Sequence, residues 1–176
     1  MTGRLPATTL ILGGARSGKS RHAEALVESQ GGRCSYIATA EPGDAEMARR
    51  IAEHQARRGV RWRTLEAPLD LAGALERCSD SDGATLVDCL TLWLSNLMAA
   101  ERDIAAETRR LVELLPHLDG AVVLVSNEVG QGVVPANALA RAFVDHAGRL
   151  HQEVAAVADS VIFMSAGLPL TLKSPQ

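Results

Sequence analysis

The residues best suited to chemistry in this chain form one short run near the N-terminus. It reads Gly13-Gly14-Ala15-Arg16-Ser17-Gly18-Lys19-Ser20 and matches the pattern GxxxxGK[ST]. Its glycines permit backbone conformations that a Cβ would forbid, so that consecutive N–H groups can turn inward around a phosphate. Lys19 is placed to reach the β- and γ-phosphates, and the Ser20 hydroxyl to bind Mg²⁺. The run therefore predicts a site for a purine nucleoside triphosphate and Mg²⁺.

Such a site also needs an acidic residue at the end of a neighbouring strand, close to the metal ion. Asp88 follows the apolar run Thr85-Leu86-Val87 and is the candidate for this role. Glu128 follows a second apolar run. It either orders a water or a second metal-bound group, or caps a turn, and the sequence favours neither role.

A basic segment from Ala48 to Arg63 contains a histidine, His54, among six arginines. One interpretation is a solvated basic helix with an incidental histidine. The other is a phosphate-binding segment that carries a nucleophile, because neighbouring guanidinium groups lower the pKa of an imidazole and keep it neutral. The spacing alone favours the first. The remaining histidines lie in contexts without such neighbours and are expected to be structural: His22, His117, His146 and His151.

The elements that must position these residues alternate between short apolar runs and helical segments. We expect strands at Thr8–Leu12, Cys34–Thr39, Trp62–Leu65, Thr85–Val87, Ala121–Ser126 and Ser160–Met164, with Leu168–Lys173 pairing at the sheet edge. We expect helices at Lys19–Ser29, Asp44–Arg57, Leu69–Cys78, Leu90–Met98, Ala105–Leu115 and Asn137–Val157. This order predicts an α/β fold with a parallel sheet covered on both faces. At 176 residues the chain is expected to form a single domain over residues 1–176.

Composition narrows the classes of function. The net charge is −3, and the aromatic residues are only two Trp, two Phe and one Tyr, so nucleic-acid binding is not expected. Three cysteines without a CxxC pair suggest neither a disulfide framework nor zinc, and Cys34 and Cys89 are expected to be buried thiols. Without a run of 18 apolar residues, we expect a cytoplasmic protein with no stable membrane insertion.

Four blocks of the sequence together resemble a known family. They are the run Gly13 to Arg21; Tyr36-Ile37-Ala38-Thr39-Ala40 with the following segments Asp44–Met47, Arg50–His54 and Trp62–Glu66; Val87 to Trp93; and Ser126 to Pro135. The chain is similar, from about Leu10 to Lys173, to the bifunctional adenosylcobinamide kinase / adenosylcobinamide-phosphate guanylyltransferases of cobalamin synthesis. The second and fourth blocks are the most specific, because phosphate loops occur in many families.

The resemblance implies two reactions. ATP or GTP phosphorylates adenosylcobinamide, and GTP then guanylylates a histidine that passes GMP to adenosylcobinamide phosphate. The nucleotidylated histidine falls on His54, and Lys19 is catalytic as well. The family's nucleotide contacts fall on Gly13, Gly14, Ala15, Arg16, Ser17, Gly18, Lys19, Ser20, Ala38, Thr39, Ala40, Gln55, Ala56, Arg57, Arg58, Glu66 and Asp88. Ser20 and Asp88 are the expected Mg²⁺ ligands, although family members carry Asp or Glu at the position of Asp88.

The resemblance also implies a RecA-like, three-layer P-loop fold and a homotrimer. Two other functions are alternatives to this bifunctional enzyme. A simple P-loop small-molecule kinase would form no covalent intermediate. A non-enzymatic GTP-binding sensor would bind nucleotide without converting adenosylcobinamide.

Overall fold

The computed structural model describes residues 5–40, 59–80 and 82–175. Its centre is one sheet of seven strands in the order β3-β2-β4-β5-β1-β6-β7. The strands are β1 (Thr8–Gly13), β2 (Arg33–Ala38), β3 (Trp62–Glu66), β4 (Gly83–Asp88), β5 (Ala121–Asn127), β6 (Ser160–Ser165) and β7 (Leu168–Lys173). Strands β1 to β6 run parallel, whereas β7 pairs antiparallel with β6 at the edge. The expected mainly parallel sheet is confirmed.

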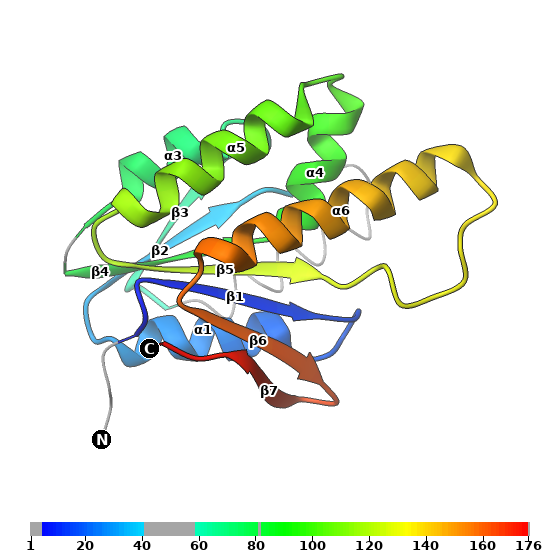
Figure 1. Ribbon diagram of the computed structural model, residues 1–176. Helices are drawn as coiled ribbons and strands as arrows, with labels where there is room; N and C mark the ends of the chain where they lie inside the picture. Colours follow the sequence, from blue (N-terminus) through cyan, green and yellow to red (C-terminus); the bar gives the residue numbers. More distant parts are fainter. Residues whose placement is uncertain (1–4, 41–58, 81, 176) are drawn as a thin grey trace.

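Helices lie on both faces of this sheet (Figure 1). They are α1 (Lys19–Ser29), α3 (Leu71–Cys78), α4 (Leu90–Ala99), α5 (Ile104–Leu114) and α6 (Ala138–Val157), with a short 3₁₀ turn η1 at Leu115–His117. Helices α3 to α6 cover one face, and α1 packs on the other. Within the described residues, none of the helices combines the length and the apolar character needed to cross a membrane.

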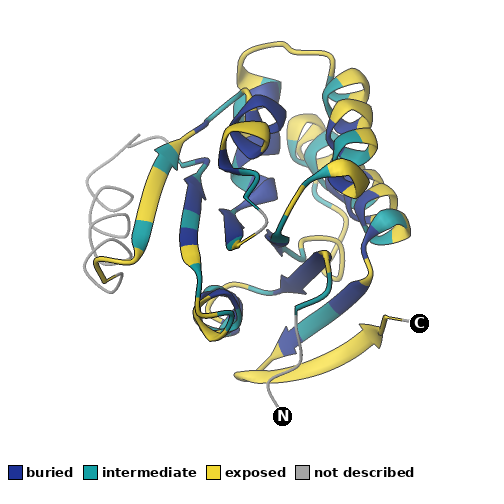
Figure 2. Ribbon diagram, turned by 90° about the vertical axis from the view of Figure 1, so that its left-hand side faces the viewer, coloured by how far each residue is buried: buried dark blue, intermediate teal, exposed yellow. Residues whose placement is uncertain are grey.

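Successive side chains of a strand point to opposite faces of the sheet, and this alternation explains the three layers. On β1, Leu10 belongs to the core under α3 to α6, and Ile11 belongs to the core under α1. Strand β5 divides in the same way, with Leu124 in the first core and Val125 in the second. Both sets are fully buried, which is typical of a parallel sheet covered on two sides. Figure 2 shows the central strands as the most deeply buried part of the chain.

The expected elements agree with the observed ones to within two residues at each end. Helix α3 begins at Leu71 instead of Leu69, because the side chain of Asp70 accepts a hydrogen bond from Gly73 N (3.1 Å) and caps the helix there. Arg63, the last residue of the basic segment, lies in β3, in agreement with the strand expected at Trp62–Leu65. The helix expected at Asp44–Arg57 lies outside the described residues.

The parallel strands all end at one edge of the sheet, at the right in Figure 1. There Gly13 of β1 lies beside Asn127 of β5, while Asp88 of β4 lies beside Ala38 of β2. In sheets of this kind, ligands bind outside the carboxyl ends of the strands. The predicted phosphate loop and the predicted metal ligand therefore share this carboxyl edge.

Candidate active site

The phosphate loop joins the end of β1 to the first turn of α1, and two of its positions require glycine. A Cβ at Gly13 would lie 2.6 Å from Ser17 Oγ and 2.7 Å from the carbonyl oxygen of Met164. Gly18, at the N-cap of α1, has a φ of +94°, a conformation that side chains disfavour. The loop thus holds the N-terminus of α1 toward the carboxyl edge, where its free N–H groups and positive dipole favour an anion.

Lys19 is buried beneath this loop. Its Nζ donates a hydrogen bond to the carbonyl oxygen of Gly14 at 2.8 Å. Burial lowers the pKa of Lys19, and the negative charge of Asp88 opposes this shift only partly. A phosphate would supply further negative charge to this partly desolvated ammonium, which is the property required of a phosphate-binding lysine.

Thr39 fixes the backbone that follows Asp88. The Thr39 hydroxyl accepts a hydrogen bond from Cys89 N and donates one to Cys89 O, both at 2.8 Å. The N–H of Thr39 also donates to the carbonyl oxygen of Asp88 at 3.4 Å. Because Thr39 is fully buried and its hydroxyl is engaged on both sides, we expect any nucleotide contact from Ala38–Ala40 to come from other atoms of the segment.

A polar cluster continues from this point toward the phosphate loop. Asn127 Nδ2 donates to Thr91 Oγ1 at 2.7 Å, and Thr91 Oγ1 lies 3.2 Å from Cys89 Sγ. We call Thr39, Cys89, Thr91 and Asn127 the edge cluster. Burial, and then the charge of Asp88, raise the pKa of Cys89 to about 11, so that this thiol is protonated at neutral pH and is no nucleophile. The edge cluster joins the carboxyl ends of β2, β4 and β5 and fixes the backbone next to Asp88.

Glu128 stabilises a turn beside the loop. Its N–H donates to the carbonyl oxygen of Gly13 at 3.0 Å, and its Oε1 accepts from Gly130 N at 2.6 Å. Of the two roles that the sequence left open, the structure thus shows the turn-capping one. Nearby, buried His151 lies with Nε2 2.7 Å from Ser126 Oγ. Burial lowers the pKa of His151, while the charge of Glu128 opposes the shift. These contacts agree with a structural role for His151.

The predicted site residues divide into three groups. Gly13 to Ser20 and Asp88 meet at the carboxyl edge, with the Ala38–Ala40 segment beside them. Glu66 ends β3, is exposed and pairs with Ala38. It lies four strand spacings from β1, roughly 19 Å away. The last group lies outside the described residues: His54, Gln55, Ala56, Arg57 and Arg58.

Sequence reasoning assigned no role to Thr91 or Asn127, although both stand in blocks that carry the family resemblance. The available signal was positional. Asn127 directly follows a buried strand and pairs with Gly13, the first residue of the loop pattern. Its hydrogen-bond partner Thr91 lies 36 residues earlier in the chain, so only the tertiary structure reveals the contact between the two side chains.

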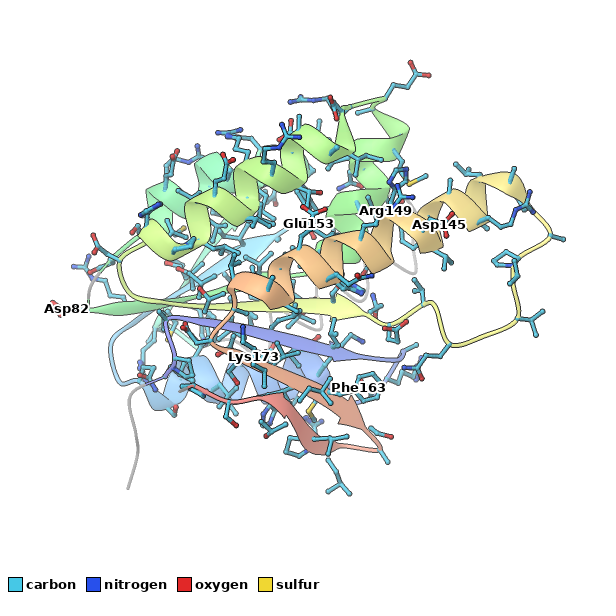
Figure 3. The ribbon with its side chains drawn as sticks, in the orientation of Figure 1. Asp82, Asp145, Arg149, Glu153, Phe163 and Lys173 are labelled. Atoms are coloured by element: carbon cyan, nitrogen blue, oxygen red, sulfur yellow. The ribbon has the colours of Figure 1, made fainter. Side chains whose placement is uncertain are left out.

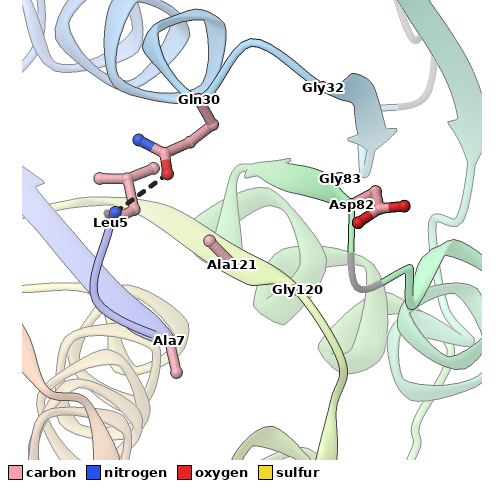
Figure 4. A pocket seen from close by; sticks show the side chains of 8 residues that line it. All are labelled: Leu5, Ala7, Gln30, Gly32, Asp82, Gly83, Gly120 and Ala121. Atoms are coloured by element: carbon pink, nitrogen blue, oxygen red, sulfur yellow. Dashed lines mark hydrogen bonds between the residues drawn. The ribbon is translucent and has the colours of Figure 1, made fainter. Parts of the chain in front are cut away.

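Two cavities lie at the opposite, amino edge of the sheet. One, of about 480 Å³, is lined by residues that include Leu5, Gln30 and Ala121 (Figure 4). In it the N–H of Leu5 donates to Gln30 Oε1 at 3.0 Å. The other, of about 470 Å³, lies at the starts of β2 and β3 and includes Arg33 and Trp62. Neither adjoins the phosphate loop, so they contribute nothing to the candidate site.

A phosphate loop after β1, an acidic residue at the end of β4 and a mainly parallel, three-layer sheet define a P-loop nucleotide-binding enzyme with a RecA-like fold. Residues 9–172 match the profile of the CobU family, cobinamide kinase / cobinamide phosphate guanyltransferase. The chain belongs to this family of cobalamin biosynthesis enzymes, as the resemblance predicted.

Relatives with curated names support this membership. The bifunctional adenosylcobalamin biosynthesis protein CobP of Pseudomonas aeruginosa is 54% identical over 166 residues, covering 93% of this chain and 96% of the relative. CobU of Salmonella typhimurium is 41% identical over 179 residues, covering 93% and 98%. Among solved structures, the flagellar accessory protein FlaH from Methanocaldococcus jannaschii superposes with a TM-score of 0.56 at 12% identity, covering 97% of this chain and 80% of that one. This last likeness concerns the fold alone.

Proposed function

We propose that this chain phosphorylates the aminopropanol hydroxyl of adenosylcobinamide with ATP or GTP, and then transfers GMP from GTP to the resulting phosphate. The observation that carries the proposal is the buried Lys19 of the phosphate loop, close enough to Asp88 to feel its charge, within a chain of the cobinamide kinase family. The family description names the two reactions, and the carboxyl edge carries the phosphate loop and Asp88, which support the proposed triphosphate binding.

In the kinase step, the substrate hydroxyl attacks the γ-phosphorus, and the bond to the β-phosphate oxygen breaks. The N–H groups of the loop bind the phosphates, and Lys19 moves from the Gly14 carbonyl to the β- and γ-phosphates. There its charge offsets the negative charge that develops on the transferring group. Positioning and electrostatics are the main requirements of phosphoryl transfer, and the loop supplies both.

Mg²⁺ suits the oxygen donors of the site, the Ser20 hydroxyl and the Asp88 carboxylate. Within the described residues, no group of three or more His, Cys, Asp or Glu side chains could hold a metal. This fits a cation that takes one or two protein oxygens and obtains its other ligands from phosphates and water. When bound, Mg²⁺ neutralises charge on the triphosphate.

In the second step, an imidazole nitrogen of His54 attacks the α-phosphorus of GTP, and pyrophosphate leaves. A phosphate oxygen of adenosylcobinamide phosphate then attacks the same phosphorus, the P–N bond breaks, and His54 is released. The intermediate divides one difficult transfer into two displacements and keeps GMP attached between them. We include Gln55 to Arg58 and Glu66 among the groups that bind the guanine nucleotide.

The test is incubation with GTP labelled at the α-phosphate, followed by mapping of the modified peptide. We expect an acid-labile, alkali-stable adduct on His54. The His54→Ala variant should lose the adduct and guanylyl transfer but keep kinase activity, because phosphoryl transfer to a hydroxyl needs no protein nucleophile. Label remaining on the variant would show that the nucleophile is another residue. A wild type that phosphorylates adenosylcobinamide without any adduct would favour the simple kinase.

The homotrimer expected from the resemblance is part of this proposal. Most soluble oligomers are homo-oligomers with closed symmetry, and sedimentation at micromolar concentration measures the mass directly. A single species of monomer mass would contradict it.

A further inference from the structure

The segment between β5 and α6 exposes several large apolar side chains. The exposed fractions are 36% for Val129, 96% for Val133, 75% for Val134 and 68% for Leu139. We call these four residues the valine surface. Single exposed apolar residues are common, but four large ones within eleven residues of one segment are a reason to look for a binding surface.

Hydrogen bonds hold the backbone of this segment at both ends. At its start, Gly130 N donates to Glu128 Oε1. At its end, Arg141 Nη1 donates to the carbonyl oxygens of Pro135 (2.9 Å) and Ala136 (2.6 Å), and the side chain of Asn137 caps α6. The chain therefore presents Val133 and Val134 to solvent from a backbone fixed on either side of them.

The segment also adjoins the phosphate loop. Glu128, directly before Val129, donates its N–H to the carbonyl oxygen of Gly13. In Figure 1 the segment, drawn in yellow, projects beyond the carboxyl edge before it turns back into α6. A substrate that lies against the valine surface can thus extend a short arm toward the bound triphosphate.

The chemistry of the segment limits what it can bind. Residues 129–140 include no Asp, Glu, Lys, Arg or His, and their polar side chains are the amides of Gln131 and Asn137. Such a surface suits a large ligand with apolar faces and uncharged amide groups. The guanidinium of Arg141, which lies beside the segment, already donates to the carbonyl oxygens of Pro135 and Ala136. The corrin ring of the acceptor carries methyl groups and amide side chains. Because the ring is large, contacts between the protein and the aminopropanol arm alone would not hold it in place.

We propose that the valine surface binds the corrin ring of the acceptor and thereby holds its aminopropanol arm at the phosphate loop. This inference rests on the proposed function, from which the acceptor is taken. The ring packs on Val133 and Val134, and its amides exchange hydrogen bonds with the exposed polar groups of the segment.

Strand β7 provides a matched control surface. It exposes Leu170 and Leu172, at 59% and 58%, but it runs away from the carboxyl edge. The last residue of β7, Lys173, contacts the C-terminal part of α6 (Figure 3). Its Nζ donates hydrogen bonds to the carbonyl oxygens of Ala155 (3.0 Å) and Ala156 (3.1 Å). Substitutions on β7 remove a similar apolar area without touching the segment after β5.

The experiment compares Val133→Ser/Val134→Ser with Leu170→Ser/Leu172→Ser in the full chain. For the valine variant we expect the KM for adenosylcobinamide to rise roughly tenfold, which corresponds to the loss of about 1.4 kcal/mol of apolar contact. Its KM for GTP, its protein–GMP adduct and its sedimentation should match wild type. The leucine variant should keep the wild-type KM for adenosylcobinamide.

Three results would overturn the inference. An unchanged acceptor KM in the valine variant would do so, and an equal rise in the leucine variant would show a non-specific effect. A fall in mass that accompanies the rise in KM would assign the valine surface to a second copy of the chain. These outcomes presuppose a wild type that phosphorylates adenosylcobinamide; without that activity the proposed function itself fails.

Discussion

The edge cluster offers a sharp test of how the site is held together, through the substitution Thr91→Val. Valine has nearly the shape of threonine and fits the same buried position. The substitution removes the oxygen that accepts from Asn127 Nδ2 at 2.7 Å. The remaining polar atom near that donor is Cys89 Sγ at 3.8 Å, which is a weak acceptor.

The expected magnitude follows from this loss. A buried donor left without its partner costs about 1–3 kcal/mol, and the added methyl group recovers up to about 0.8 kcal/mol. Asn127 is only partly buried, so water relieves some of the cost. We expect the free energy of unfolding to fall by about 1.5 kcal/mol and Tm by about 4 °C for a chain of this length. Because the cluster fixes the backbone next to Asp88, kcat should fall roughly tenfold.

The assay is urea and thermal unfolding of three variants, with kinase turnover measured on each. Thr91→Ser keeps the hydroxyl and should retain kcat. Thr9→Val is the matched control, because Thr9 Oγ1 is buried and has no hydrogen-bond partner within the described residues. It should leave stability unchanged or raise it by up to about 1 kcal/mol. If Thr91→Val equals wild type in stability and kcat, the Thr91 hydroxyl does not contribute to the positioning of Asp88.

Three further predictions concern charge and burial. Lys19→Ala should abolish both activities with little change in Tm, since its ammonium is partly desolvated and contributes little to stability; comparable turnover would refute the phosphate-loop assignment. Burial lowers the pKa of His151, so the unfolded chain binds its proton more readily and stability should fall as pH drops below about 6.5; urea midpoints at pH 7.5 and 5.5 should differ less in His151→Gln than in wild type. The buried thiols Cys34, Cys78 and Cys89 should resist iodoacetamide at pH 8 until urea unfolds the chain, as peptide mass spectrometry would show.

Much of the fold follows from the sequence because its strands are short apolar runs and its helices carry clear boundaries. The run Val122–Val125 is apolar without interruption, which in a chain of alternating elements indicates a strand buried on both faces. Asn137 predicts the start of α6, and its side chain caps that helix. The start of α3 was expected two residues too early because Asp70, which caps the helix, was counted as one of its residues.

The candidate site was predictable to the extent that its residues form one contiguous pattern. Gly13 to Ser20 follow one another directly and combine backbone N–H groups with the side chains of Lys19 and Ser20, so their spacing alone identifies them. Asp88 could be proposed because the ends of parallel strands meet at one edge. Thr39 remains a predicted nucleotide contact. Its hydroxyl bonds to the Cys89 backbone, and no sequence pattern encodes that pairing across 50 residues.

In the proposed scheme, two acceptors must reach one phosphate loop, a hydroxyl at the γ-phosphorus and the His54 imidazole at the α-phosphorus. The topology lets them arrive on separate segments. The valine surface belongs to the connection after β5, the strand next to the loop strand, whereas His54 belongs to the connection after β2, three strand spacings away. We therefore expect substitutions to separate the two roles. Val133→Ser/Val134→Ser should impair use of the corrinoid in both reactions and spare the adduct, whereas His54→Ala should abolish the adduct and spare the first reaction. Loss of both properties in either variant would mean that the two segments act as one unit.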